Sequence, residues 1–350
     1  MGAGSGPSNS LLRSLRAADM PHVLVGCHAD RFTLKKSGAD RNYLIRGPEH
    51  PDFLDSLLEI VERERIELLV PNTDADVLAV SALRRTLPCR VFLPPHDVIE
   101  ACQDKYALTL LLRAKGVPAP LTHPVTDRAA VAELFAALGP RERLWCRIRT
   151  GSGSRGAIPV RTEAQLWSWV SYWEEMRGVA PGEFTLSEYL PGRDYSLQCL
   201  WKEGVLVLAK SAERLSYFGG GSTPSGMSST PALAKRVFEP RVAEVCAAAI
   251  RALDARMSGV FCFDLKETAG GVPCVTEINA GRFAMITNIY DLAGKHNMAA
   301  TFVRLAFGDP VDVAEAYAPT DDYYLVRDLD TEPGIFHADQ VFVGIEETGA

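Results

Sequence analysis

The sequence contains no long hydrophobic run, no long basic run and no apolar N-terminal segment. Without about 20 consecutive apolar residues, no membrane-spanning helix is expected, and without an apolar core near the N-terminus no signal peptide is expected. The net charge of -7 at pH 7 argues against nucleic acid as the main partner. We therefore expect a cytoplasmic protein whose partners are small molecules.

The eight cysteines include no C-x-x-C pair and no cluster with metal-ligand spacing. Several stand within apolar stretches, such as HVLVGC at 22–27 and VFCFDL at 260–265. This distribution is typical of buried, reduced thiols in a cytosolic protein. Structural zinc and a disulfide framework are accordingly not expected.

The composition is that of a globular protein, with 47% hydrophobic and 23% charged residues. This balance excludes extensive disorder. A chain of 350 residues exceeds one compact core of ordinary size, so we expect two or three packed subdomains.

The first hundred residues alternate short apolar runs with amphipathic ones. Such alternation with short loops predicts a parallel, doubly wound layer of the Rossmann-like type. The expected strands are 22–27, 42–46, 66–71 and 90–94, and the expected helices are 8–18, 51–65 and 74–87.

The chain opens on a glycine-rich stretch, MGAGSGPSNS, with the form of a phosphate-binding loop that joins a strand to a helix. Nothing in the sequence precedes it, so the strand that should come first is missing. We expect either an N-terminal sheet without that strand or a sequence that begins one strand late. The loop itself either faces the acceptor substrate or turns the chain tightly.

After residue 100 the pattern changes to an α+β one. Residues 105–115 predict an amphipathic helix, which Gly116 and Pro118 end. A strand, a glycine loop, a second strand and an aromatic helix follow before residue 190.

The remainder of the chain predicts long strands and two helices. The glycine- and serine-rich segment 215–230 is predicted to be a loop with a strand before it and a helix after it. The expected strands are 194–212, 258–268, 272–280, 323–330 and 340–347, and the helices are 240–253 and 298–308. We expect three parts, at 1–100, 101–190 and 191–350.

The stretch RTGSGSRGAIPV places a glycine loop at the tip of a hairpin. Small residues there let successive backbone N–H groups approach phosphate oxygens, and Ser152 and Ser154 add hydroxyl donors. Arg147, Arg149 and Arg155 surround the loop. Since there is no G-K-[ST] and no following helix, it is not a P-loop. We predict a loop that covers phosphates.

A second feature is the strand end formed by Glu188, Tyr189 and Leu190 before a Pro-Gly pair. A bend there exposes one carbonyl and one amide that suit an adenine edge, with Asp194 placed to take ribose hydroxyls. A strand followed by a plain turn gives the same pattern, so both interpretations stay open.

The stretch FDLKETAGGVPCVTEIN predicts a β-hairpin that carries oxygen ligands. Glu277 and Asn279 are two apart and therefore point to one face, and the hairpin brings Asp264 beside them. Two carboxylates and an amide oxygen suit Mg²⁺ that bridges phosphates. An exposed sheet face with ordinary acids is the alternative.

These four elements, in this order, resemble the ATP-grasp superfamily: a lysine-bearing helix, the R-x-R-x-G-S-G-S-R-G loop, E-Y-L-P-G-x-D and D…E-I-N. The resemblance is closest to a single synthetase unit of carbamoyl phosphate synthetase and covers nearly the whole chain. It implies a Rossmann-like domain before a two-subdomain ATP-grasp module, with ATP and two Mg²⁺ (or Mn²⁺ in their place) as cofactors. It is compatible with a homodimer.

The resemblance also implies roles for residues. Lys105 and Arg147 would hold the ATP phosphates, with Arg147 where many relatives carry lysine, and Arg282 would stabilise the charge at the γ-phosphate. The loop residues over the triphosphate would be Arg149, Gly151, Ser152, Gly153, Ser154, Arg155 and Gly156. The remaining implied sets are adenine at Glu188, Tyr189 and Leu190, ribose at Asp194, and Mg²⁺ at Asp264, Glu277 and Asn279, with Glu277 bridging.

We therefore expect an ATP-dependent ligase. A small-molecule carboxylate would attack the γ-phosphate, and an amine would then displace phosphate from the acyl phosphate to form an amide. Lys210 and Arg214, before the 215–230 loop, are candidates for binding the acceptor carboxylate. Simple surface charge explains these two residues equally well.

Three other functions stay open from the sequence. The first is an ATP-grasp kinase, or an enzyme that forms carboxy-phosphate or carbamoyl phosphate without an amide product. The second is an NAD-dependent oxidoreductase built on the first glycine loop, although only Asp30 stands near the expected ribose-binding position. The third is a nucleotide-binding regulator without chemistry, which the intact set Asp264, Glu277 and Asn279 disfavours.

Overall fold

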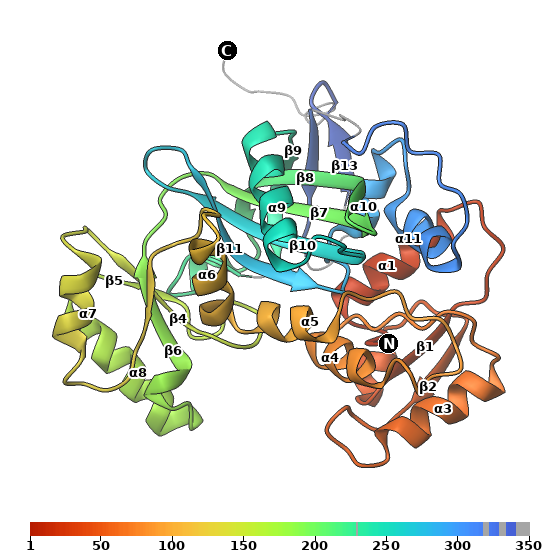
Figure 1. Ribbon diagram of the computed structural model, residues 1–350, viewed down its shortest axis with the longest axis horizontal. Helices are drawn as coiled ribbons and strands as arrows, with labels where there is room; N and C mark the ends of the chain where they lie inside the picture. The colour runs from red at the N-terminus through yellow and green to blue at the C-terminus, as the bar shows by residue number, and fades with distance from the viewer. Residues whose placement is uncertain (229, 318–321, 329–333, 341–350) are drawn as a thin grey trace, which may run out of the picture.

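The computed structural model describes residues 1–228, 230–317, 322–328 and 334–340. Its strands form three sheets (Figure 1), ordered β1-β2, β3-β6-β4-β5 and β11-β10-β7-β8-β9-β12-β13. The first sheet is parallel and the paired strands of the other two are antiparallel. The predicted α/β class, with a parallel N-terminal region and antiparallel sheets after it, is confirmed.

The N-terminal region holds the parallel pair and four helices. Helix α1 has a proline in its first turn, which suits a helix start, and buries Leu11 and Leu15 on one face. Helix α4 begins where the Thr73 hydroxyl accepts a hydrogen bond from the Asp76 amide. The elements are α1 (Gly6–Arg16), β1 (Val25–His28), α2 (Arg31–Leu34), β2 (Arg41–Leu44), α3 (Phe53–Arg63) and α4 (Asp74–Leu83).

The predicted strands 66–71 and 90–94 are wrong as strands, because these segments share only one parallel bridge, Leu68 to Arg90. The chain start lies beside them: the Met1 amino group donates to the Val70 carbonyl at 2.7 Å, and the Ala3 amide donates to the Cys27 carbonyl at 3.1 Å. Residues 1–3 thus lie between β1 and residue 70, where the sequence predicts a missing strand. So short a neighbour supports no continuous ladder.

The four-stranded sheet and two helices form a separate lobe, at the left of Figure 1. The predicted hairpin on either side of the glycine loop is β4 and β5, and the aromatic helix is α8, which starts at the Thr162 cap and ends at Gly178 in the left-handed region. The elements are β3 (Thr122–Pro124), α7 (Val131–Leu138), β4 (Leu144–Ile148), β5 (Ile158–Val160), α8 (Glu163–Arg177), η1 (Pro181–Glu183) and β6 (Phe184–Glu188).

The seven-stranded sheet contains strands at the predicted positions 258–268, 272–280 and 323–330, but the stretch predicted as one strand at 194–212 is the hairpin of β7 and β8, and β9 and β13 are additional. Strand β9 follows the 215–230 loop, where the sequence predicts a helix directly. The predicted strand 340–347 lies outside the described residues from 341 onward. The elements are β7 (Asp194–Lys202), β8 (Val205–Tyr217), η2 (Gly220–Ser222), β9 (Pro231–Arg236), α9 (Pro240–Leu253), β10 (Gly259–Glu267), β11 (Pro273–Ala280), α10 (Thr287–Leu292), α11 (Met298–Phe307), β12 (Tyr323–Val326) and β13 (Gly334–His337).

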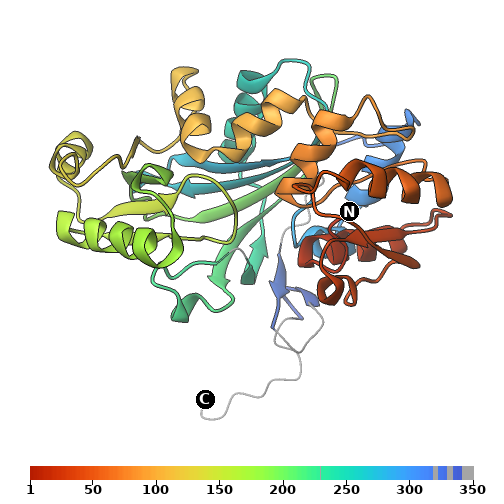
Figure 2. The same cartoon turned by 90° about the horizontal axis from the view of Figure 1, so that it is seen from below.

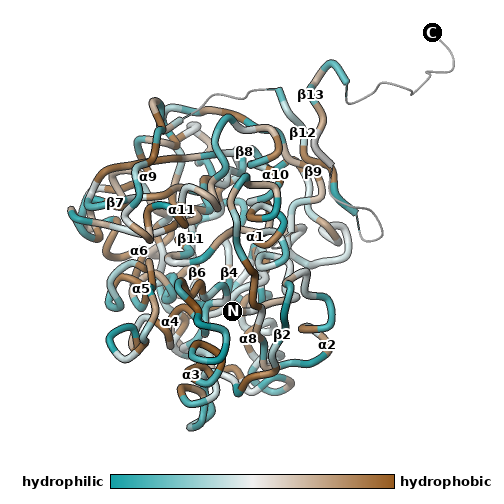
Figure 3. The backbone as a smooth tube through the Cα atoms, turned by 90° about the vertical axis from the view of Figure 1, so that its right-hand side faces the viewer, coloured by the Kyte–Doolittle hydropathy of each residue, from teal (hydrophilic) through white to brown (hydrophobic). Residues whose placement is uncertain are grey.

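Helices cover both faces of this sheet. Helices α5 (His96–Gln103), α6 (Lys105–Ala114) and α9 lie on one face (Figure 2), where Cys199 and Phe261 are in the core. Helices α1 and α11 pack on the other face against Leu200 and Val260. This alternation follows the two-residue period of a strand, and in Figure 3 hydrophobic segments gather where α9, α11 and these strands meet.

All eight cysteines are free, and all but Cys89 are buried, as the sequence predicts. Burial raises the pKa of the Cys102 thiol to about 12, so this group is an unreactive part of the core. Among the helices of the described residues, none is both long enough and apolar enough to cross a bilayer.

Candidate functional site

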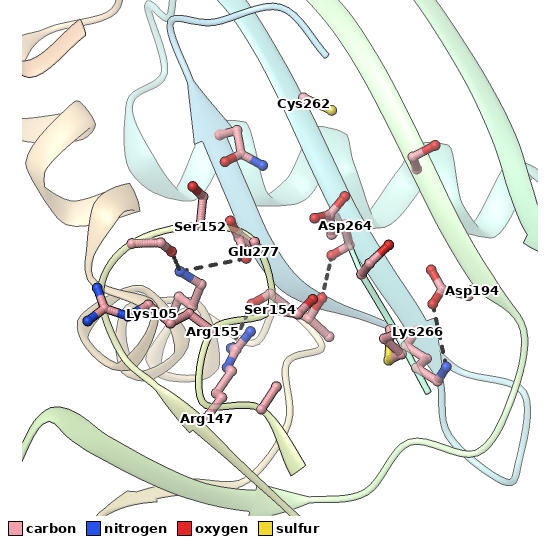
Figure 4. A pocket seen from close by; sticks show the side chains of 18 of the residues that line it. Lys105, Arg147, Ser152, Ser154, Arg155, Asp194, Cys262, Asp264, Lys266 and Glu277 are labelled. Atoms are coloured by element: carbon pink, nitrogen blue, oxygen red, sulfur yellow. Dashed lines mark hydrogen bonds and ion pairs between the residues drawn. The ribbon is translucent and has the colours of Figure 1, made fainter. Parts of the chain in front are cut away.

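A cavity of about 410 Å³ lies where the start of α1, the glycine loop, the end of β6 and the β10–β11 hairpin meet. Figure 4 shows the loop residues Ser152, Ser154 and Arg155 on one side of this space and Asp264 and Glu277 on the strands opposite. The predicted site residues that line it are Lys105, Arg147, Gly151, Ser152, Gly153, Ser154, Arg155, Glu188, Tyr189, Leu190, Asp194, Arg214, Asp264, Glu277, Asn279 and Arg282.

Three predicted site residues lie elsewhere. Arg149 points to Asp104 and forms an ion pair with it, and Gly156 packs on the lobe core, where an added Cβ would lie 2.7 Å from Ile148. Lys210 is 3% exposed and donates to the Tyr290 carbonyl at 3.1 Å. The sequence places these residues near the site but does not reveal which way their side chains point.

The predicted oxygen ligands face one another across the β10–β11 hairpin. Asp264 is paired in register with Glu277, and Cys262 with Asn279, so the three oxygen-bearing side chains share one face. Burial raises the pKa of Glu277, while Lys105 opposes this rise and Asp264 adds to it. Two carboxylates and an amide oxygen held this close fit a hard divalent cation such as Mg²⁺. Among the described residues, no three His, Cys, Asp or Glu side chains lie where they could hold a metal ion together. The third ligand would therefore be the amide of Asn279.

Cationic groups surround these oxygens. The Lys105 ammonium lies 3.7 Å from the Glu277 carboxylate and donates to the Gly151 carbonyl. Burial lowers its pKa in spite of the attraction of Glu277. Arg147 donates to the Thr276 carbonyl at 2.8 Å. Buried positive charges beside a flexible glycine loop form a setting suited to anionic phosphates.

Arg282 links the N-terminal region to the hairpin. Its Nε donates to Asp74 at 2.6 Å and its Nη2 donates to the Asn279 amide oxygen. Asn72 also joins the two parts, because its Oδ1 accepts from the Phe283 amide at 2.7 Å. Sequence reasoning misses these contacts, because the stretch PNTDAD at 71–76 has the pattern of an ordinary helix start.

Asp194 stands within a polar network. Tyr217 donates to it at 2.7 Å, Lys266 at 3.4 Å and Arg214 at 3.3 Å, and Arg214 also pairs with Asp264. Sequence reasoning misses Tyr217 and Lys266. Lys266 is detectable, since it lies two residues after Asp264 on the same face. Tyr217 is not, because register shifts after Arg214 break the alternation of β8.

At the strand end predicted to face adenine, the Glu188 side chain is used within the protein. It accepts from the Leu121 amide at 2.8 Å and lies 3.5 Å from Arg141. Leu190 is buried. The Glu188 main-chain amide also donates to the Leu121 carbonyl at 3.0 Å, so the predicted backbone role toward adenine stays a prediction that falls on Tyr189 and Leu190.

The glycine loop is held at both ends. At its start the Lys105 amide donates to the Arg149 carbonyl at 2.9 Å, and at its end α8 contacts the loop. The Trp169 indole N–H donates to the Gly156 carbonyl at 2.9 Å, and the Arg155 guanidinium lies 5.6 Å from the Trp173 ring centroid. At Gly151 and Gly153 an added Cβ would meet nothing within 4 Å. The tip therefore stands clear of other atoms, while α8 anchors the end of the loop.

Trp169→Phe is expected to raise the KM for ATP several-fold with little change in kcat, since one hydrogen bond to the loop is worth about 0.5–1.5 kcal/mol. Steady-state kinetics would measure the split. Trp167→Phe, a partly buried tryptophan in the same helix, is the matched control. An unchanged KM in Trp169→Phe would contradict the anchoring role.

No family model matches the sequence, but solved structures share the fold. The biotin carboxylase domain of Hydrogenobacter thermophilus 2-oxoglutarate carboxylase, a dimer with MgADP, ADP and bicarbonate, matches with a TM-score of 0.70 at 14% identity over 91% of this chain and 72% of that one. Thermus thermophilus N5-carboxyaminoimidazole ribonucleotide synthetase matches at 0.65 and 18%, over 93% and 81%. An L-amino acid ligase from Bacillus licheniformis matches at 0.61 and 13%, over 92% and 76%. The chain therefore has the ATP-grasp fold.

Proposed function

We propose that the chain is an ATP-dependent carboxylate–amine ligase that works with Mg²⁺, or Mn²⁺ in its place. One observation carries the proposal: the cross-strand carboxylates Asp264 and Glu277 share one cavity with Lys105, Arg147 and Arg282. Under this proposal, the cavity lies where three domains, 1–100, 101–190 and 191–350, meet. Among the solved structures with this fold, the L-amino acid ligase supports an amide product.

The chain's own residues position the reactants. Lys105 and Arg147 bind the phosphates, and the loop residues Ser152 and Ser154 close over them. The main chain at Glu188–Leu190 faces adenine, and Asp194 takes the ribose hydroxyls. Buried, preoriented charges act strongly here because little solvent screens them.

The residues predicted to bind Mg²⁺ act on the charge of the phosphates. When bound, Mg²⁺ would be held by Asp264, Glu277 and Asn279 and would neutralise phosphate charge. Arg282, tied to Asp74 at 2.6 Å, is held beside these ligands and stabilises the charge on the transferred phosphoryl group. The two magnesium ions implied for such a site would share Glu277.

The proposed reaction has two steps. A carboxylate oxygen of the acceptor attacks the γ-phosphorus, the bond to the β-phosphate oxygen breaks, and ADP leaves. The amine nitrogen then attacks the acyl carbon, the carbon–oxygen bond to phosphate breaks, and the amine releases a proton to the leaving phosphate or to solvent. Positioning and charge neutralisation suffice for both steps, without a covalent protein nucleophile.

The test is release of ADP and phosphate with panels of carboxylic acids, each with and without amines, followed by mass spectrometry of the products. We expect turnover that requires both an acid and an amine and yields an amide. If ADP and phosphate form equally fast without an amine and no amide appears, the ligase assignment fails. A kinase or a carboxy-phosphate-forming enzyme is then the better description.

A further inference from the structure

The cavity extends past Arg282 into a part that the nucleotide and metal residues do not use. Its walls come from the N-terminal glycine loop, from the loop before β9 and from the segment that follows Arg282. We call this part the acceptor lobe, lined by Ser5, Pro7, Met227, Pro231, Met285 and Ile286. Ser228, next to Met227, also lines the cavity. The hydroxyls of Ser5 and Ser228 donate within the protein, to Ser8 at 3.1 Å and to the Phe218 carbonyl at 2.9 Å, and the other side chains of the lobe are apolar.

The wall that carries Met285 is fixed from two sides. The Phe283 amide donates to Asn72 at 2.7 Å, and the Ala284 amide donates to the Gln198 side chain at 2.9 Å. The segment is thus tied both to the N-terminal region and to strand β7. Such fixation turns Met285 into a defined wall.

The N-terminal glycine loop packs directly against Met285, and its residues Ser5 and Pro7 line the cavity beside it. An added Cβ at Gly6 would lie 2.9 Å from the Met285 terminal methyl group. Gly6 has no positive φ, so its small size rather than its backbone freedom matters here. The loop that looked like a nucleotide site is thereby placed beside the acceptor.

The charged side chains at the entrance to the acceptor lobe favour the binding of an acceptor with a single carboxylate group. Arg214 is occupied by Asp194 and Asp264. Arg282 uses Nε for Asp74 and Nη2 for Asn279, and within the described part of the chain its Nη1 has no hydrogen-bond partner. One guanidinium N–H therefore remains available to an anionic group at the boundary between the metal set and the apolar walls.

We infer that the acceptor is a monocarboxylic acid with an uncharged, apolar body, whose carboxylate meets Arg282 and whose body lies against Met285 in the acceptor lobe. This inference rests on the proposed function and names its substrate class. A second charged group on the acceptor would have to lie against Met227, Met285 or Ile286, unpaired, which is costly.

The test combines binding and turnover. Calorimetry with Mg²⁺ and a non-hydrolysable ATP analogue would measure binding of apolar monocarboxylates, hydroxy acids and dicarboxylates, and ADP release would measure their kcat/KM. We expect apolar monocarboxylates to lead in both. Met285→Gln should lower kcat/KM for them about tenfold or more, the effect of mismatching one apolar contact, with the KM for ATP unchanged. Met176→Gln, an exposed methionine on α8 (64% exposed), should have no effect.

Gly6→Ala gives a second, independent readout. It pushes only the flexible end of Met285 and should narrow the lobe, so bulky acids lose more kcat/KM than short ones. Preference for dicarboxylates or hydroxy acids, or a Met285→Gln variant that behaves like wild type, would overturn the inference while the ligase function stands. If no acid of any class supports ADP release although the ATP analogue binds, the proposed function fails and the inference falls with it.

Discussion

Glu277→Gln is expected to abolish nearly all ATP-dependent turnover, lowering kcat/KM by about a thousandfold, because charge stabilisation through a metal is worth several kcal/mol. The substitution removes the carboxylate that pairs with Asp264 across the hairpin and lies 3.7 Å from Lys105. It keeps the size of the side chain. Initial rates of ADP formation over a range of Mg²⁺ concentrations would measure the loss and any change in metal dependence.

The same variant should gain stability relative to the wild type as the pH rises. Burial raises the pKa of Glu277 and lowers the pKa of Lys105, so for both groups desolvation outweighs their mutual attraction. A carboxyl whose pKa is raised on folding favours the folded state below its unfolded pKa, and this contribution is lost as the pH rises through the folded pKa. Glutamine has no such pH dependence, so the stability of the variant relative to the wild type should increase as the pH rises.

Thermal unfolding of Glu277→Gln and of the wild type over a range of pH would check this. The control is Glu59→Gln, which alters an exposed carboxylate on α3 paired with Arg63 at 2.8 Å. The control should keep both activity and Tm. A Glu277→Gln protein with a wild-type rate would remove the metal assignment, and one with a much lower Tm would show that Glu277 serves the fold rather than the chemistry.

Local patterns predict the part of the site that is built from one hairpin and one loop. Glu277 and Asn279 share a face because strands have a period of two, and a tight turn brings Asp264 opposite. The glycine loop is likewise recognisable from its own residues. In each case the geometry depends on neighbours within about twenty positions, where turn and strand rules hold.

Contacts between distant segments are beyond such rules. Nothing near Asp74 indicates that Arg282 will donate to it across 208 positions, and nothing in MGAGSG indicates that Gly6 will lie against Met285. The same limit explains why the strands expected at 66–71 and 90–94 do not form. Their residues favour a strand, but the segment beside them in the sheet consists of residues 1–3. A strand needs a partner as well as a pattern.

Lys210 provides the clearest example of a contact that local patterns do not predict, because its charge and its position on β8 suit an acceptor-binding role. In the structure the Lys210 and Asp291 side chains are each 2% exposed and form an ion pair. Asp291 also accepts from the Met298 amide at 2.8 Å, at the start of α11. An added Cβ at Gly294 would lie 2.6 Å from the Lys210 ammonium. The pair therefore holds α10 and α11 to the sheet, away from the cavity lining.

Lys210→Met is thus expected to destabilise the protein by about 3–5 kcal/mol, the usual cost of stranding one member of a buried ion pair. For a chain of 350 residues the corresponding fall in Tm is about 4–7 °C. Lys210→Met/Asp291→Asn should recover a large part of this loss, because the double variant strands no charge while the side-chain amide introduced at position 291 can still accept from the Met298 amide. Lys115→Met, at an exposed lysine, is the matched control. Calorimetry and the KM for the acceptor separate the two roles. A Lys210→Met protein with the wild-type Tm and a raised KM would show that Lys210 binds the acceptor. Recovery of Tm in the double variant would show that the ion pair stabilises the fold.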